Sequence, residues 1–254
     1  LANQDFATAT DSNNTAVGYN AGLSVTTGTS NTLIGGQAGD AITTGGSNVA
    51  LGTLALSANT TASENTAVGY QAAYSTTTGV SNSALGWRSF YTNTTGIQNV
   101  ALGERALHLN TTGSYNVSVG MDSLKANTTA SANTAVGYQA GYANTTGTPT
   151  TAFGYQALKA NTTGTNNCAF GQGTLQTNIT GTTNSAFGTL ALSANTGSNN
   201  SAVGYASLLT NIGGADNVAM GVSSLRVNTT GGQNTALGTS ALIANTTASN
   251  NTAV

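Results

Sequence analysis

Residues 133–147 read NTAVGYQAGYANTTG, and variants of this stretch recur along the whole chain. A period this short and regular is typical of a solenoid, in which one structural unit stacks on copies of itself. The sequence therefore predicts a repeat architecture. Its central glycine recurs every 17 residues, with one step of 16, at Gly18, Gly35, Gly52, Gly69, Gly86, Gly103, Gly120, Gly137, Gly154, Gly171, Gly188, Gly204, Gly221 and Gly238.

The Thr-Ala-Val segment before each glycine favours a β-strand, because it is β-prone and its side chains alternate. The Gln-Ala-Leu-x-Ala segment after the glycine resembles the start of a helix. It is, however, far shorter than the ~12 residues that sustain a helix without tertiary contacts. We therefore expect an all-β fold, a parallel β-solenoid or β-roll of about fifteen 17-residue coils stacked ~4.8 Å apart.

Two columns of large apolar residues are expected to form the core; a column is the set of residues at one position of successive repeats. One column precedes the glycine, as at Val17, Leu51 and Phe170, and the other lies four residues after it, as at Leu107 and Leu175. The strand's Ala column would then face outward, and we expect it to pack against a neighbouring chain. A preference for small residues beside a tight glycine bend is the alternative explanation.

An Asn column lies four residues before the glycine, and only Thr150 departs from it. We expect a structural ladder there, because Asn side chains bond nearby backbone and one another. A second Asn column follows the glycine by seven residues and forms Asn-x-Thr sequons. Two readings stay open for these sequons: ordinary turn chemistry, or a ladder of glycans on Asn or on the doubled threonines. The candidate glycosylation sites are Asn59, Asn93, Asn110, Asn127, Asn144, Asn161, Asn178, Asn228 and Asn245.

The charge pattern and single cysteine exclude several classes of function. Charged residues make up 5% of the chain and its net charge is −2, so binding of nucleic acid through phosphate neutralisation is not expected. No run approaches the ~20 apolar residues of a membrane span. The single cysteine, Cys168, is expected to be a small core residue. We expect residues 1–13 to form a degenerate first coil or cap, and residues 14–254 a continuous solenoid cut from a longer fibre.

No constellation of catalytic residues is evident. His108 occupies a variable column and is expected to be exposed, and the carboxylates are scattered over different columns. We therefore expect no enzymatic activity, no cofactor and no metal site. Aromatic residues follow several glycines and are expected to cover the core or a chain interface, with sugar contact as the alternative; these are Tyr19, Tyr70, Trp87, Tyr138, Tyr155 and Tyr205.

The Thr-Ala-Val-Gly-x-x-Ala run at residues 15–21, 66–72 and 134–140 resembles the head repeats of trimeric autotransporter adhesins. The strings NTAVGYQA and ALKANTTG resemble repeats of tail-fibre-domain proteins from bacteria and phages. The likeness spans residues 14–254. It implies a left-handed β-roll built by three chains. The adhesin repeat is shorter, and an added Asn-Thr-Thr-Gly turn accounts for the longer coil here.

Together these features predict an extracellular structural fibre, or the stalk or head of an adhesin, on a cell surface or virion. The expected partner is the chain itself, as a homotrimer, with end-to-end filament growth as a further expectation. Glycans or a cell-surface ligand are further expected partners. The alternative function is a carbohydrate- or ice-binding β-solenoid.

Overall fold

The computed structural model describes residues 12–254, and residues 1–11 of the expected first coil or cap lie outside this range. The chain divides into unit 1 (Leu1–Ser131) and unit 2 (Ala132–Val254). The described residues contain strands and turns but no helix. Unit 1 holds β1 (Thr15–Val17), β2 (Thr32–Ile34), β3 (Val49–Leu51), β4 (Thr66–Val68), β5 (Ser83–Leu85), β6 (Val100–Leu102) and β7 (Val117–Val119). Unit 2 holds β8 (Thr134–Val136), β9 (Thr150–Phe153), β10 (Asn167–Phe170), β11 (Ser185–Phe187), β12 (Ser201–Val203), β13 (Val218–Met220), β14 (Thr235–Leu237) and β15 (Thr252–Ala253).

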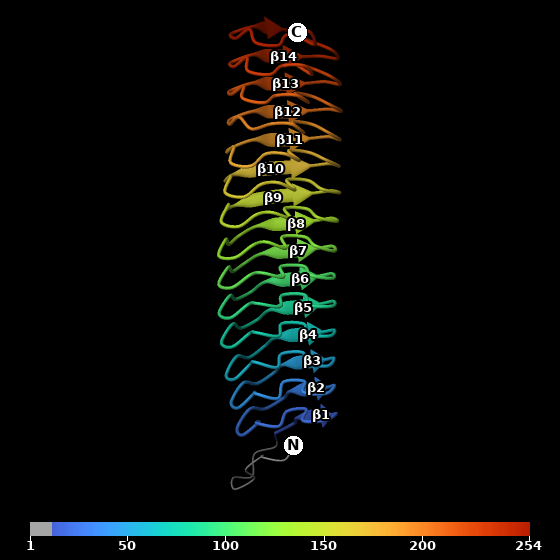
Figure 1. The fold of residues 1–254 in the computed structure, drawn as a ribbon, viewed down its shortest axis with the longest axis vertical. Coiled ribbons are helices and arrows are strands. Elements are labelled where there is room, and N and C mark those ends of the chain that lie inside the picture. The colour runs from blue at the N-terminus through green and yellow to red at the C-terminus, as the bar shows by residue number, and fades with distance from the viewer. Residues whose placement is uncertain (1–11) are drawn as a thin grey trace. The chain divides into compact units, whose positions relative to one another are not determined.

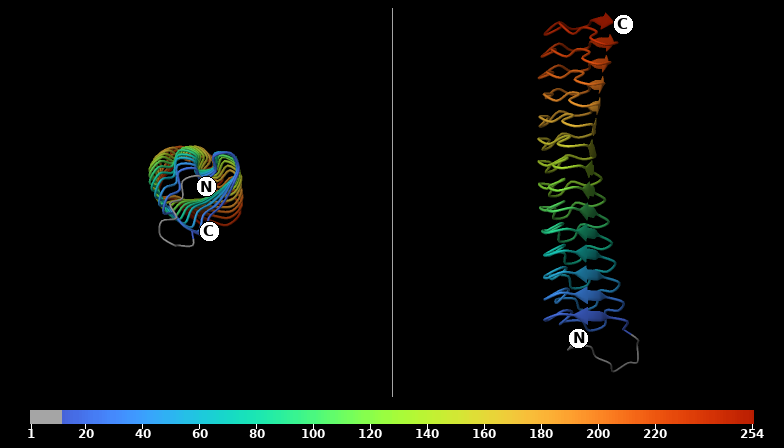
Figure 2. Two further views of the ribbon diagram at one scale, coloured as in Figure 1. Left: turned by 90° about the horizontal axis from the view of Figure 1, so that it is seen from below. Right: turned by 90° about the vertical axis from the view of Figure 1, so that its right-hand side faces the viewer.

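Within each unit, every strand pairs in parallel with the strand of the next coil (Figure 1). Equivalent repeat positions are partners, as in Ala50↔Ala67 of unit 1 and Ala169↔Ala186 of unit 2. The coils of each unit therefore superpose when viewed along the stacking direction (Figure 2). The predicted all-β parallel solenoid is confirmed for each unit.

The 16-residue step of unit 2 is absorbed in a turn. The Asn195 and Asn178 side chains pair across 17 residues, whereas those of Asn200 and Asn184 pair across 16. The missing residue therefore falls between Asn195 and Asn200. The strands on either side keep their register, with Ala186 opposite Ala202.

The structure differs from the prediction in the orientation of the strands, because the opposite face of each strand points into the core. Column members such as Ala50 and Ala186 are fully buried, whereas the residue before the glycine is largely exposed, as at Leu51 (45%) and Phe187 (41%). The expected inward Val column was therefore wrong, and so was the expected outward Ala column. The leucines four after the glycine are buried as predicted, except Leu242 near the chain end, which is half-buried. Because these leucines and two asparagine columns fill the interior, only a methyl group fits inside the strand.

One coil of unit 1 shows how tightly this interior is filled. Gly39 takes the place of the core leucine, while Leu33 replaces the strand alanine and Ile42 replaces the turn asparagine. Both larger side chains are fully buried. A Cβ added at Gly39 would lie 2.8 Å from atoms of each. The two larger residues thus occupy the volume that the leucine vacates, as close packing requires.

The segment after the glycine is a series of tight turns, not a strand. The residues two and four after the glycine have left-handed φ values, as at Leu54 (60°) and Leu56 (51°) in unit 1. This conformation costs about 1–2 kcal/mol for a residue with a Cβ. Burial of the leucine, worth about 1.5–3 kcal/mol, offsets that cost.

The recurrent glycine is required by both conformation and space. Gly154 has φ +128°, and a Cβ built on it would lie 2.7 Å from the carbonyl carbon and oxygen of Gly171 in the next coil. Backbone cannot retreat from such a contact without breaking the strand pairing. The sequence signal that defines the repeat is therefore a requirement for close approach between coils.

We predict that Gly154→Ala lowers the melting temperature of the chain, because strained backbone and coil contact together cost about 2 kcal/mol or more. Gly213→Ala is the matched control: its φ is not in the left-handed region, and its nearest neighbour is a Thr230 methyl at 4.0 Å. Circular dichroism melting curves compare the two. Equal melting temperatures for both variants would contradict the close-approach explanation.

Candidate interaction surface

The outward strand face is the surface formed by the residues one and three before each recurrent glycine. In the first of these columns every side chain is apolar and none is buried. Alternation along the strand forces this arrangement, because the intervening alanine points into the core. The column comprises Val17, Ile34, Leu51, Val68, Leu85, Leu102 and Val119 in unit 1, and Val136, Phe153, Phe170, Phe187, Val203, Met220, Leu237 and Val254 in unit 2.

The residues three before the glycine are smaller and mostly carry hydroxyl groups. In unit 2 this column contains Thr151, Cys168 and Ser185 beside three successive phenylalanines. Cys168 is half-buried on the outward strand face, so its predicted place in the core was wrong. Burial raises the pKa of the Cys168 thiol. On the outward strand face of unit 2, a column of large side chains, which we call the ridge, thus lies beside a column of small ones, which we call the groove.

Three phenylalanines form a stacked ladder on this ridge. The ring centroids of Phe153 and Phe170 are 5.2 Å apart and those of Phe170 and Phe187 are 5.3 Å apart, with 7° between the planes in each pair. The ring faces therefore contact one another, and ring edges line the outer surface. Sugars bind aromatic residues mainly through exposed ring faces, so the central ring, Phe170, offers no platform for a sugar.

The aromatic column after the glycine is exposed in both units, with Tyr19, Tyr155 and Tyr205 its most accessible members. Tyr138 and Tyr155 stack at 5.4 Å in unit 2. In unit 1 the Arg88 guanidinium lies 4.8 Å from the centre of the Trp87 ring. These side chains do not cover the core of their own chain. Their role at a chain interface stays a prediction.

The Asn-Thr-Thr turns place the candidate glycosylation residues inside the coil. Asn59, Asn93, Asn110, Asn127, Asn144, Asn161, Asn178 and Asn228 are buried, and Asn245 is half-buried near the chain end. Asn161 Nδ2 donates to Asn144 Oδ1 and to the Gly164 carbonyl, both at 3.0 Å. A sugar on this nitrogen would replace one of its two hydrogens and so remove one of these bonds, and the buried position leaves no room for the sugar. The geometry therefore favours turn chemistry and counts against a ladder of Asn-linked glycans.

The first threonine of many turns is also tied to the next coil. In unit 1, Thr111 Oγ1 donates to the Thr128 carbonyl at 3.0 Å. In unit 2, Thr145 Oγ1 donates to the Thr162 carbonyl at the same distance. The second threonine of these turns is exposed, as at Thr112 and Thr146. The two threonines thus differ: one holds coils together and the other faces solvent.

One coil of unit 1 interrupts the turn ladder. Thr76 stands where the neighbouring coils carry Asn59 and Asn93, and its buried hydroxyl has no hydrogen-bond partner. The next asparagine, Asn93, therefore has no carboxamide oxygen in the coil before it. Asn110, one coil further, does have one, and donates to Asn93 Oδ1 at 3.0 Å. Val25 and Ile42 occupy this position in two earlier coils, and between Asn59 and Asn127 Thr76 is the one gap in the turn ladder of unit 1.

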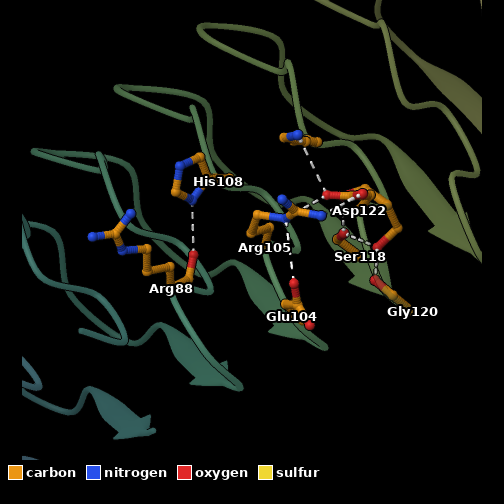
Figure 3. A network of polar contacts seen from close by, with 9 residues as sticks. Arg88, Glu104, Arg105, His108, Ser118, Gly120 and Asp122 are labelled. Carbon is orange, nitrogen blue, oxygen red and sulfur yellow. Dashed lines mark hydrogen bonds and ion pairs between the residues drawn. The ribbon is translucent and has the colours of Figure 1, made fainter. Parts of the chain in front are cut away.

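Five charged residues of unit 1, Arg88, Glu104, Arg105, Asp122 and Lys125, lie on three adjacent coils (Figure 3). Arg105 meets Asp122 through two contacts, Nη2–Oδ2 at 3.0 Å and Nε–Oδ1 at 2.9 Å. Lys125 Nζ lies 3.6 Å from Asp122 Oδ1, and Glu104 Oε1 lies 3.6 Å from Arg105 Nε. Asp122 is almost fully buried, so paired cations are what make its charge tolerable there. The cluster is an ionic link between successive coils.

His108 lies beside this cluster. Its ring stacks on Tyr91 at 5.2 Å, and its Nδ1 is 2.9 Å from the Arg88 carbonyl oxygen. The ring is half-buried, which corrects the expected exposed position. Burial holds the pKa of His108 below its ordinary value, and nearby Lys125 and Arg88 add to the lowering, while the bond to the Arg88 carbonyl opposes it. Over residues 12–254, no group of three His, Cys, Asp or Glu side chains could hold a metal ion.

We predict that Thr76→Asn raises the melting temperature, because the new carboxamide joins Asn59 to Asn93 and replaces an unpartnered hydroxyl. The expected gain is about 1–2 kcal/mol. Thr78→Asn, at an exposed position of the same turn, serves as control and should leave the melting temperature unchanged. A decrease for Thr76→Asn would show that the ladder is not what stabilises this turn.

We also predict that the chain loses stability as the pH falls below about 6.5, the ordinary pKa of histidine. Because the pKa of His108 is lower in the folded state, the unfolded state binds the proton more readily in this range. Above this pH, His108 is neutral in the folded and the unfolded state, so its titration no longer changes the stability of the chain. Melting curves at pH 7.5 and 5.5 should show a smaller decrease for His108→Tyr, since Tyr91 fills the same position one coil earlier. Equal decreases would contradict this prediction.

Two comparisons with known proteins gave no match. No protein-family model matches the chain, and no curated protein is detectably similar to it. Between residues 12 and 254 there is no helix of the length and apolarity that crossing a membrane demands.

Proposed function

We propose that this chain is a structural segment of an extracellular fibre or of the stalk or head of an adhesin, and that it acts by self-association. Its work is mechanical: it spaces, stiffens or displays other parts of a larger assembly. The single observation that carries the proposal is the asparagine ladder, which links successive coils of each unit through side chains as well as backbone.

The ladder is denser than strand pairing alone requires. In unit 1, Asn99 donates from its backbone nitrogen and from Nδ2 to Asn82 Oδ1, at 2.9 and 3.1 Å. Nδ2 also donates to the Gly113 carbonyl at 3.0 Å. Each such bond contributes about 1 kcal/mol. Because the buried polar side chains form hydrogen bonds between coils, the segment is suited to bearing mechanical load.

Unit 2 repeats the arrangement, and it tolerates one substitution. Asn217 donates from its backbone nitrogen and Nδ2 to Asn200 Oδ1, at 3.1 and 3.2 Å. At the one departure, Thr150 donates from both its backbone nitrogen and Oγ1 to Asn133 Oδ1, at 2.8 and 2.9 Å. The donors to the preceding carboxamide are thus preserved. This supports a structural role for the column.

The resemblance to adhesin heads and tail-fibre repeats supports an extracellular location and self-association as parts of the same proposal. A carbohydrate-binding module is the less favoured function, because the phenylalanine ladder presents ring edges. An ice-binding module is also less favoured, because the first threonine of many turns spends its hydroxyl on a backbone carbonyl.

The proposal predicts that antibodies raised against the purified chain label the outer surface of intact source cells or particles. Immunogold electron microscopy without permeabilisation measures this directly, and the label should follow surface filaments. An antibody against a known interior protein of the same source controls for leakage. Label that appears only after permeabilisation would overturn the proposed location and role.

A further inference from the structure

We propose that the outward strand face of unit 2 is the self-association surface, occupied by the same face of a second copy of the chain. This inference rests on the proposed function and names its contact surface. The sequence pointed to the alanine column for this role. Because those alanines are buried in the core, the surface has to be sought elsewhere.

The outward strand face of unit 2 combines exposure with apolar character. Met220 is 48% exposed and Phe153 and Val203 are each 39% exposed, in successive or nearby coils of one column. From Phe153 to Met220, five successive coils each place such an exposed side chain in this column, so the side chains form a stripe and are not scattered. The largest contiguous apolar patch on a typical monomer covers about 300–600 Å² and is often functional.

The size of the face suits a weak or moderate protein interface. Strand residues advance ~3.3 Å each and coils lie ~4.8 Å apart, so the eight strands of unit 2, of about three residues each, present roughly 400 Å². The adjoining aromatic column, with Tyr138, Tyr155 and Tyr205, widens this to about 600 Å². Interfaces of about 1,200 Å² in total, or 600 Å² on each partner, are at the lower end of the specific range.

The relief of the face is self-complementary. Phe153, Phe170 and Phe187 form the ridge, and Thr151, Cys168 and Ser185 form the adjoining groove. Two copies related by a two-fold axis would place the ridge of each in the groove of the other, as an isologous interface requires. Ring edges then meet methyl and methylene groups, which is a favourable apolar contact.

Charge also favours a second copy over other occupants. Unit 2 carries three charged residues, Lys159, Asp216 and Arg226, and none lies in the two columns of the face. Two copies therefore meet without like-charge repulsion. A nucleic acid or anionic membrane surface would need basic residues on this face. A sugar would need exposed ring faces and several hydrogen-bonding groups.

The test uses the 254-residue chain, with Cys168 as a native reporter in the groove. Sedimentation velocity follows association over a concentration series, and alkylation by iodoacetamide follows access to the thiol. We expect association with concentration and a parallel slowing of alkylation, about tenfold when nine-tenths of the chain is associated.

Two lysine substitutions test whether association depends on the outward strand face or on another part of the surface. Met220→Lys places a charge on the outward strand face, and we expect it to stay monomeric with fast alkylation at all concentrations. Ile179→Lys places the same charge on a turn residue that is 50% exposed and off the face, and it should behave as the unaltered chain. Circular dichroism confirms that both variants fold; if Met220→Lys does not, Phe170→Thr replaces it.

Each other outcome overturns the inference. Association that leaves Cys168 fully reactive, or that Met220→Lys does not weaken, would place the contact on another surface and leave the proposed function standing. A chain that stays monomeric throughout would refute self-association by this face. Slowed alkylation of monomeric chain by added oligosaccharides would assign the face to a carbohydrate. Surface labelling of source cells is independent of all these results.

Discussion

The carboxamide of the asparagine four before each glycine is the interaction on which each unit depends. Its oxygen accepts from the next coil's backbone and side chain, as Asn82 does from Asn99, and its nitrogen reaches the carbonyl of a following turn. One side chain thereby fixes the register of the strand, the position of the turn and the distance between coils. Register errors would break several bonds at once, which explains why the 17-residue period is so strictly kept.

This ladder also decides which surface the chain presents. Because two asparagine columns and a leucine column fill the interior, the strand contributes alanine to the core in nearly every coil, Leu33 and Ser118 being the exceptions. Alternation then sends valine, leucine or phenylalanine outward in every coil. The apolar outward strand face is thus a consequence of a narrow interior, and it recurs in each unit. A protein built this way has a surface suited to association.

The sequence predicts the parallel β-solenoid, the asparagine ladder and the buried leucines, because each leaves a strictly periodic signal. It misassigns the two faces of the strand, since Ala and Val are both apolar and periodicity alone cannot tell which points inward. It also places Cys168 in the core for the same reason. The left-handed leucines were missed, although glycine replaces leucine in that column at Gly22, Gly39 and Gly141 and was a usable signal. The cluster around Arg105 and Asp122 could not be found, because it joins residues from adjacent coils.

The most direct test of the ladder is hydrogen exchange of asparagine side chains in a chain labelled with ¹⁵N at asparagine only. If the ladder is correct, most side-chain NH₂ signals are dispersed in the proton–nitrogen spectrum and persist long after transfer to D₂O. If they instead collapse to the position of free asparagine and vanish at once, the carboxamides do not join successive coils and the account is wrong.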